Sequence, residues 1–137
     1  MRKILLLGFI PFLLIGCSKT ELDYSMFDDQ HITWNEIFSI ESNAYDVYFY
    51  STSCLHCHSI KDEVLAFAKK HKDTFYFVKE SSQFVFGKNI EDTIGVTLLE
   101  DFYVAGVPTL VHFSFHIVCS HLLGESQIKN YIETFPF

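Results

Sequence analysis

The chain has 137 residues, four cysteines and a formal net charge of −7 at pH 7. This length corresponds to one domain, and the negative charge argues against nucleic-acid binding, which needs cationic groups to neutralise phosphates. The sequence contains no internal repeat, low-complexity tract or second domain.

The chain begins with a segment that has the layout of a secretory signal. Residues 1–3 (MRK) are followed by an apolar stretch at residues 4–15. The stretch is shorter than the ~20 residues of an ordinary membrane span, and a basic start before a short apolar run is typical of a signal peptide. Residues 14–17 (LIGC) resemble a bacterial lipobox, in which a diacylglycerol is attached to the cysteine and the chain is cut just before it.

On this interpretation residues 1–16 are a lipoprotein signal peptide, and Cys17 anchors the protein to the cell membrane on its extracytoplasmic side. Residues 17–31 are mostly polar and are predicted to be a tether, with a first short strand around Tyr24–Phe27 as the alternative. The alternative for the start is a plain signal peptide, or an uncleaved anchor, in which Cys17 is incidental.

The next predicted elements are a short helix and a buried strand. Thr33–Glu36 fits a capping box, in which Thr and Glu satisfy free amides at a helix start, so a short helix is expected through Phe38. Residues 45–51 (YDVYFYS) are apolar on both faces apart from Asp46. This pattern predicts a central strand that is covered on both sides.

An amphipathic helix is predicted directly after the cysteines at positions 54 and 57. Charged residues separate apolar ones that recur at helical spacing; these are Ile60, Val64, Phe67, Ala68 and His71. A second buried strand follows at residues 74–80 (TFYFVKE).

The C-terminal part is predicted to add two strands and a helix. Residues 81–106 are expected to contain one helix near 97–103. Two consecutive strands follow at 109–115 and 116–124, and the last helix covers 125–135. Strands joined through helices indicate an α/β domain with a mixed sheet covered on both faces, which would bury many of the 15 Phe and 7 Tyr residues.

The segment STSCLHCHSI, residues 51–60, raises three chemical possibilities. Cys-x-x-Cys is typical of a redox dithiol, Cys-x-x-Cys-His is the attachment motif of a c-type haem, and a Cys/His cluster suits a metal. The two cysteines lie where a predicted buried strand turns into a helix. The first turn of a helix presents free amides and the positive end of the dipole, which stabilise a thiolate.

Residues 54–58 match the haem attachment motif completely, but the rest of the chain argues against a haem. Small c-type cytochromes are mostly helical, whereas this pattern is α/β. Met26 is the only methionine left after removal of the signal, and it precedes the motif. The remaining candidates for a distal ligand are His112, His116 and His121.

The metal interpretation uses Cys54, Cys57 and His58 as ligands. Thiolates favour copper(I) or zinc, but helical geometry makes it hard for all three side chains to converge. The sequence therefore predicts no metal and no cofactor.

The sequence is similar to the thioredoxin superfamily over about residues 32–135. The resemblance depends on two motifs in order: CLHC at 54–57 after a buried strand, and GVPT at 106–109 before the next predicted strand. It implies a thioredoxin-like three-layer α/β/α domain, residues 32–137, with a mixed central sheet. In that family the proline of the second motif has a cis peptide bond and lies against the active-site sulfurs.

The resemblance also implies roles for particular residues. Cys54 would be the nucleophile and Cys57 the resolving thiol, while Val107 and Pro108 would shape the substrate groove. His56 has the position of the histidine in the Cys-Pro-His-Cys centre of DsbA-type oxidases, where an imidazole stabilises the thiolate and makes the couple more oxidising. The alternatives are a static disulfide, an ordinary strand-start proline and an exposed loop histidine.

The chain departs from plain thioredoxin at several positions. Ser53 replaces a tryptophan, and Tyr48 occupies the place of a buried acid that transfers protons, which leaves water to take the proton of Cys57. Asp62 stands where many relatives have a helix-kinking proline, and an insertion falls near residues 81–100.

These features predict a membrane-tethered thiol–disulfide oxidoreductase whose partners are envelope proteins with thiols or disulfides and a membrane redox partner. The compartment and His56 favour oxidation or isomerisation, and reduction stays an alternative because tethered reductases of this fold also work in the envelope. The alternative is a thioredoxin-like binding module or copper metallochaperone without redox turnover. Cys119 is expected to be a small buried residue within a strand.

Overall fold

The computed structural model describes residue 16 and residues 20–136. The predicted signal peptide at 1–16, apart from Gly16, and the predicted lipidation site Cys17 lie outside these described residues. Within the described range, no helix is long and apolar enough to cross a membrane.

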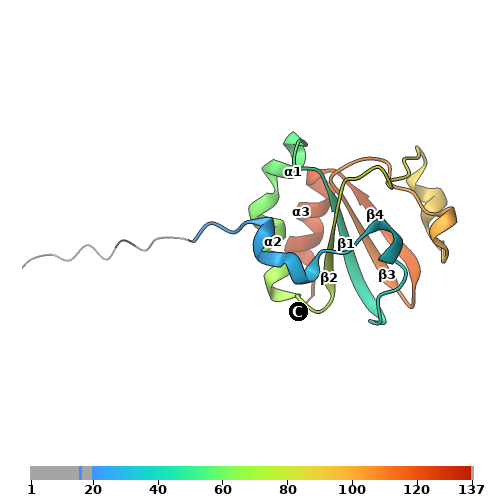
Figure 1. Cartoon of the computed structure of the whole chain (residues 1–137), viewed down its shortest axis with the longest axis horizontal. Helices are drawn as coiled ribbons and strands as arrows, with labels where there is room; N and C mark the ends of the chain where they lie inside the picture. The colour runs from blue at the N-terminus through green and yellow to red at the C-terminus, as the bar shows by residue number, and fades with distance from the viewer. Residues whose placement is uncertain (1–15, 17–19, 137) are drawn as a thin grey trace, which may run out of the picture.

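The core of the fold is a mixed sheet of four strands in the order β2-β1-β3-β4 (Figure 1). The strands are β1 (Ala44–Tyr50), β2 (Phe75–Lys79), β3 (Thr109–Ser114) and β4 (Ile117–Leu123). Strands β1 and β2 run parallel, whereas β3 is antiparallel to both of its neighbours. The predicted α/β fold with a mixed sheet is confirmed.

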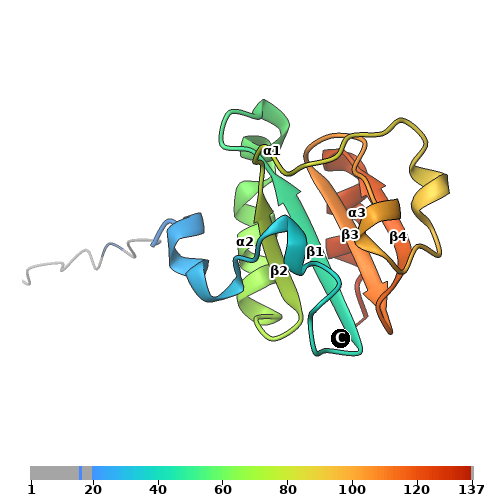
Figure 2. The ribbon, with the colours of Figure 1, turned by 45° about the vertical axis from the view of Figure 1, so that its right-hand side comes forward.

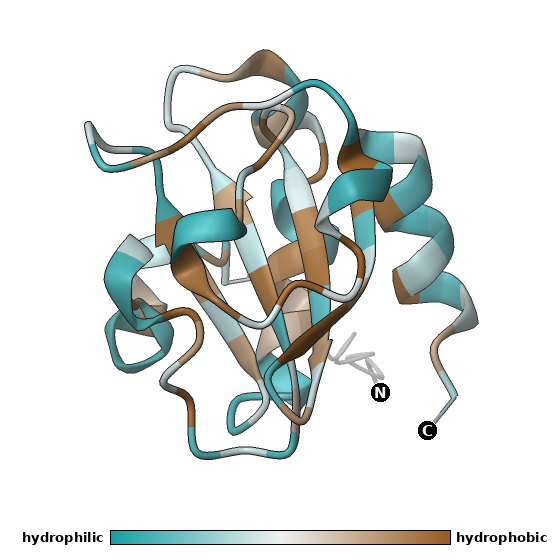
Figure 3. Ribbon diagram, turned by 90° about the vertical axis from the view of Figure 1, so that its right-hand side faces the viewer, coloured by the Kyte–Doolittle hydropathy of each residue, from teal (hydrophilic) through white to brown (hydrophobic). Residues whose placement is uncertain are grey.

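Strand β1 is central because its sequence has apolar side chains on both faces. Every residue from Tyr45 to Tyr50 is buried. Tyr48 and Tyr50 enter the core on one face of the sheet, and Val47 and Phe49 enter the core on the other. Hydrophobic colour accordingly follows the central strands in Figure 3. A strand of this kind is stable only between two covering layers.

One covering layer consists of the helices α1 (Leu55–Ser59), α2 (Lys61–Lys70) and α3 (Glu125–Thr134) (Figure 2). The sequence predicted a single helix after the cysteines, but the structure breaks it at Ile60, where φ is −106° and ψ is 9°. The Ile60 side chain is fully buried. Helix α2 contains no proline, so the break does not depend on one.

The other covering layer is built from 3-10 turns and loops. The turns are η2 (Trp34–Glu36), η3 (Ile90–Thr93) and η4 (Leu99–Asp101). The helix predicted near 97–103 is therefore wrong, because only the short turn η4 forms there. The bulky side chains that close this face of the sheet are Trp34, Ile37, Phe84, Phe102 and Val104.

The N-terminal segment packs on the domain earlier than predicted. Tyr24–Gln30 forms the 3-10 helix η1, so the suggested strand at Tyr24–Phe27 is wrong. Phe27 is buried, and the Gln30 side-chain amide donates to the carbonyl oxygens of Ala68 and Phe75 at 3.2 and 2.9 Å. The sequence predicted a tether through residue 31, but residues 24–31 belong to the folded domain.

Candidate redox site

Cys54 caps the start of helix α1 at the end of the sheet that β1 points to (Figure 2). Its backbone is extended, with φ −85° and ψ 119°, and its Sγ accepts a hydrogen bond from the backbone N–H of Cys57 at 3.1 Å. A side-chain acceptor at this position satisfies one of the free amides of the first turn. The same bond stabilises negative charge on the Cys54 sulfur.

Cys57 lies behind Cys54 and is only 2% exposed, whereas Cys54 is partly exposed. Both are free thiols in this structure. Burial raises the pKa of the Cys57 thiol to about 12, and the neighbouring Cys54 sulfur contributes to the increase. The two cysteines therefore differ in exposure and protonation. The Cys54 sulfur faces outwards, and the Cys57 thiol lies behind it and keeps its proton.

Val107 and Pro108 lie beside the outer sulfur. The Cys54 Sγ donates to the carbonyl oxygen of Val107 at 3.5 Å, and the Val107–Pro108 peptide bond is cis. Strand β3 begins directly after Pro108, so the sheet positions this bend. The structure thus places the Cys54 sulfur against the backbone directly before Pro108, and the roles of Cys54, Cys57, Val107 and Pro108 stay predictions.

His56 points towards helix α3. Its Nδ1 lies 3.3 Å from Oε2 of Glu125, and its side chain is 72% exposed. The pKa of the Glu125 carboxyl is lowered, first by the hydrogen bond from His56 and then by Ser59. Among the described residues, no hydrogen bond joins His56 to either sulfur. The geometry therefore favours the exposed histidine that the sequence left as the alternative.

Two tyrosines lie close to the buried thiol. Tyr48 on β1 and Tyr24 on η1 both have buried hydroxyls, and each phenol affects the pKa of the other. Burial raises the pKa of both phenols, and both thiols raise them further. Tyr48 therefore stays a neutral phenol and does not replace the missing acid. The residues around Tyr24 do not indicate that it lies so close to Cys57.

The other candidate ligands lie away from the cysteines. His112 bonds to Asp46 near the start of β1, and His121 bonds to Thr93 on the opposite face of the sheet. Within residues 20–136, no group of three or more His, Cys, Asp or Glu side chains is placed to hold a metal ion. Cys119 is exposed, so the prediction that it is a buried core residue is wrong.

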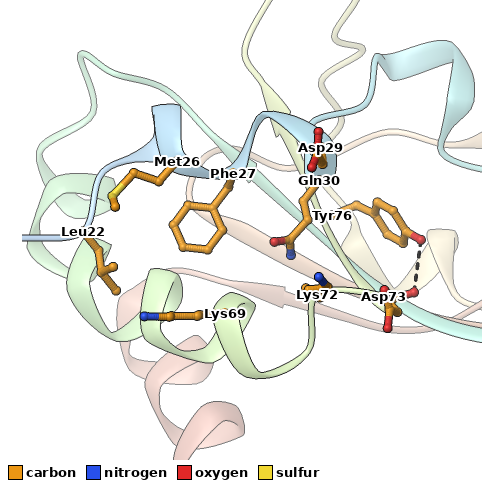
Figure 4. A pocket seen from close by; sticks show the side chains of 9 residues that line it. All are labelled: Leu22, Met26, Phe27, Asp29, Gln30, Lys69, Lys72, Asp73 and Tyr76. Carbon is orange, nitrogen blue, oxygen red and sulfur yellow. Dashed lines mark hydrogen bonds between the residues drawn. The ribbon is translucent and has the colours of Figure 1, made fainter.

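A hollow of about 560 Å³ lies away from the two cysteines, between the N-terminal segment and the end of helix α2 (Figure 4). Leu22, Met26 and Phe27 line one side of it, and Lys69 and Tyr76 line the other. No cysteine contributes to this hollow. Its size therefore does not mark the site of the cysteine chemistry.

The fold and the placement of the cysteine pair define a thioredoxin-like domain. Thioredoxin f from spinach chloroplasts is 14% identical, with a TM-score of 0.52, and the match covers 76% of this chain and 87% of that chain. Mitochondrial thioredoxin 3 from Saccharomyces cerevisiae is also 14% identical, with a TM-score of 0.53 over 76% of this chain and 92% of the other. Thioredoxin from Aeropyrum pernix is 20% identical, with a TM-score of 0.51 over 74% and 80%.

At these identities the likeness is one of fold. No protein-family model matches the sequence, and a search of curated proteins gave no match.

Proposed function

We propose that this protein is a thiol–disulfide oxidoreductase that works through Cys54 and Cys57. The observation that carries the proposal is the arrangement of the two sulfurs. The Cys54 sulfur is partly exposed, receives the Cys57 amide at 3.1 Å and lies 3.5 Å from the Val107 carbonyl, while Cys57 is buried behind it. A static structural pair would not need one sulfur at the surface beside an open backbone bend.

The chemistry follows from this arrangement. The Cys54 thiolate attacks a substrate disulfide, so the substrate S–S bond breaks, one substrate thiolate leaves and takes a proton, and a mixed disulfide forms. Cys57 then loses its proton and attacks the Cys54 sulfur. The second substrate thiol leaves, and the Cys54–Cys57 disulfide holds the oxidised state. The substrate disulfide has gained two electrons, and the reverse sequence oxidises two substrate thiols.

The protein acts at the cell membrane. The lipobox-like residues 14–17 support a lipid anchor on Cys17, facing the extracytoplasmic side. The substrates are envelope proteins with thiols or disulfides, and a membrane redox partner resets the pair. If this is right, the full chain sediments with membranes, and Cys17→Ser is recovered in the soluble fraction. A Cys17→Ser chain that stays with the membrane would contradict the anchor.

The enzymatic proposal is tested by trapping the intermediate. In a Cys119→Ser background, which removes the exposed third thiol, Cys57→Ser should accumulate mixed disulfides with envelope proteins that a reductant releases. Cys54→Ser is the matched control and should trap none, because Cys57 is buried. If Cys57→Ser traps no more than Cys54→Ser, the pair does not exchange with protein substrates.

A further inference from the structure

Cys57, although buried, borders a second hollow at the surface. Cys57 lies on the wall of a hollow of about 210 Å³ that is separate from the Val107 side of the site. The lining residues are Asp23, Tyr24, Ser51, Thr52, Cys57, His58 and Lys61. The N-terminal segment supplies part of this wall, so packing of residues 23–24 on the domain creates the hollow.

An ion pair closes the rim of the hollow. Lys61 Nζ lies 2.6 Å from Oδ1 of Asp23 and 5.7 Å from the centroid of the Tyr24 ring. The Lys61 side chain is 19% exposed, so its ammonium group is held close to the protein surface. Asp23 is itself fixed, because its carboxylate accepts hydrogen bonds from the backbone N–H and the hydroxyl of Ser25.

The groups that face Cys57 leave few candidates to assist the loss of its proton. Tyr24 on η1 and Tyr48 on β1 are buried neutral phenols, because burial raises the pKa of each of them. In the mixed disulfide, Cys54 carries no proton and no charge. Glu125 on α3 is bonded to His56. The remaining ionisable groups at the hollow are Asp23, His58 and Lys61.

We propose that Lys61, held in place by Asp23, promotes the proton loss of Cys57 through this hollow when the mixed disulfide is resolved. The ammonium group stabilises the Cys57 thiolate as it forms, and solvent water takes the proton. The thiolate then attacks the Cys54 sulfur, the Cys54–Cys57 bond forms, and the substrate thiolate departs and is protonated by solvent. The proposal rests on the proposed function. It assigns to Lys61 and Asp23 a part of the task that a buried acid at the position of Tyr48 would otherwise perform.

The test isolates the step in which Cys57 reacts. In the full chain with Cys119→Ser, a 2-nitro-5-thiobenzoate group is attached to Cys54 as a mixed disulfide, and release of the coloured thiolate is followed across pH. Lys61→Met should slow the release about three- to tenfold at pH 7 and move its pH profile upwards. Lys61→Arg keeps the cation and should restore the rate. Lys129→Met is the matched control. Lys129 Nζ lies 3.4 Å from Oε1 of Glu63, and this ion pair is not part of the hollow.

A double-mutant cycle tests the positioning role of Asp23. Asp23→Ala should slow the release in the wild-type background and have no further effect in the Lys61→Met background, because its effect acts through Lys61. Attachment of the reagent to Cys54 should be unchanged in every variant, and urea unfolding identifies any variant that does not fold. An unchanged pH profile for Lys61→Met, or a Lys61→Arg rate as slow as that of Lys61→Met, overturns the inference. If the unmutated site releases no thiolate at all, the proposed function fails with it.

Discussion

The Cys54 sulfur and the Val107 carbonyl oxygen meet at 3.5 Å although 53 positions separate them along the chain. Cys54 follows strand β1, and Val107 precedes strand β3, which pairs antiparallel with β1. The end of one strand and the start of the other therefore fall at the same edge of the sheet. This pairing is what places a reactive sulfur beside an open stretch of backbone.

The first prediction concerns the difference between the two thiols. We expect iodoacetamide at pH 7 to modify Cys54 at least about tenfold faster than Cys57, because only the thiolate reacts and Cys57 is buried with a raised pKa. Peptide mapping by mass spectrometry measures both rates. Cys119, which is exposed and lies in a strand, is an internal reference. Equal rates at Cys54 and Cys57 would show that the described asymmetry is absent in solution.

The second prediction concerns His56. The imidazole of His56 faces Glu125 rather than the sulfurs. We therefore expect His56→Ala to change the reduction potential of the cysteine pair by less than about 15 mV, which corresponds to ~0.7 kcal/mol for a two-electron couple. Redox titration against glutathione provides the measurement. A fall of about 60 mV or more would instead restore the role of His56 as an oxidising residue.

The third prediction concerns a partly buried cluster of three side chains that includes Tyr131 of helix α3. Asp46 accepts a hydrogen bond from His112 Nδ1 at 2.7 Å and from the Tyr131 hydroxyl at 3.1 Å. The hydrogen bond to Asp46 raises the pKa of His112 above its ordinary value of 6.5. The stabilisation of the fold by the His112–Asp46 pair is therefore fully present below pH 6.5, and it is lost as the pH rises through the raised pKa of His112.

We expect His112→Gln to lower the free energy of unfolding by about 1 kcal/mol more at pH 6 than at pH 9. Urea titrations at the two pH values measure this difference, and His58→Gln at an exposed position is the control. Tyr131→Phe should cost about 1 kcal/mol at both pH values, because it removes a hydrogen bond without a charge. A His112→Gln cost that is larger at pH 9 would contradict the assigned pairing.

The fourth prediction concerns His121, which lies in the opposite core. The Thr93 hydroxyl donates to the Ile90 carbonyl at 2.6 Å, so it accepts from His121 Nδ1 at 2.9 Å. The other ring nitrogen, Nε2, is then unprotonated, and it is buried without a partner in the described part of the chain. Burial lowers the pKa of His121 to about 4. The contribution of neutral His121 to the free energy of unfolding is thus fully present above pH 6.5 and is lost as the pH falls towards 4.

We expect the wild-type protein to lose about 2 kcal/mol of stability between pH 7.5 and pH 5 relative to His121→Leu, which carries no titrating group. Unfolding curves at the two pH values, recorded for both proteins, give the comparison. Parallel loss of stability in the two proteins would mean that His121 titrates normally, and therefore that the Thr93 contact does not hold it in the core.

The strands and the cysteine motif were predictable because local patterns determine them. An unbroken run of apolar residues at 45–50 has no stable place except the middle of a covered sheet. The Gly-Val-Pro-Thr motif at residues 106–109 likewise predicted that Val107 and Pro108 precede strand β3 at the site. These patterns depend on residues that are neighbours in the sequence, which sequence reasoning can use directly.

Other features depend on contacts between distant residues. Tyr24 packs against Tyr50 with ring centroids 4.0 Å apart, and this contact turns part of a polar segment into a wall of the site. Nothing in the residues around Tyr24 indicates such a partner. Cys119 is exposed because the β3–β4 pairing shifts between His112 and Phe113, which leaves Cys119 as an extra residue on its strand. Strict alternation along a strand cannot predict a bulge.

The most direct test of the account is the reduction potential of the Cys54–Cys57 pair. In the Cys119→Ser chain, titration against glutathione and dithiothreitol buffers should show one two-electron couple between about −270 and −120 mV, the range of exchanging centres. A potential below about −300 mV, typical of structural disulfides, or two cysteines that never form an intramolecular bond, would contradict the proposed electron transfer.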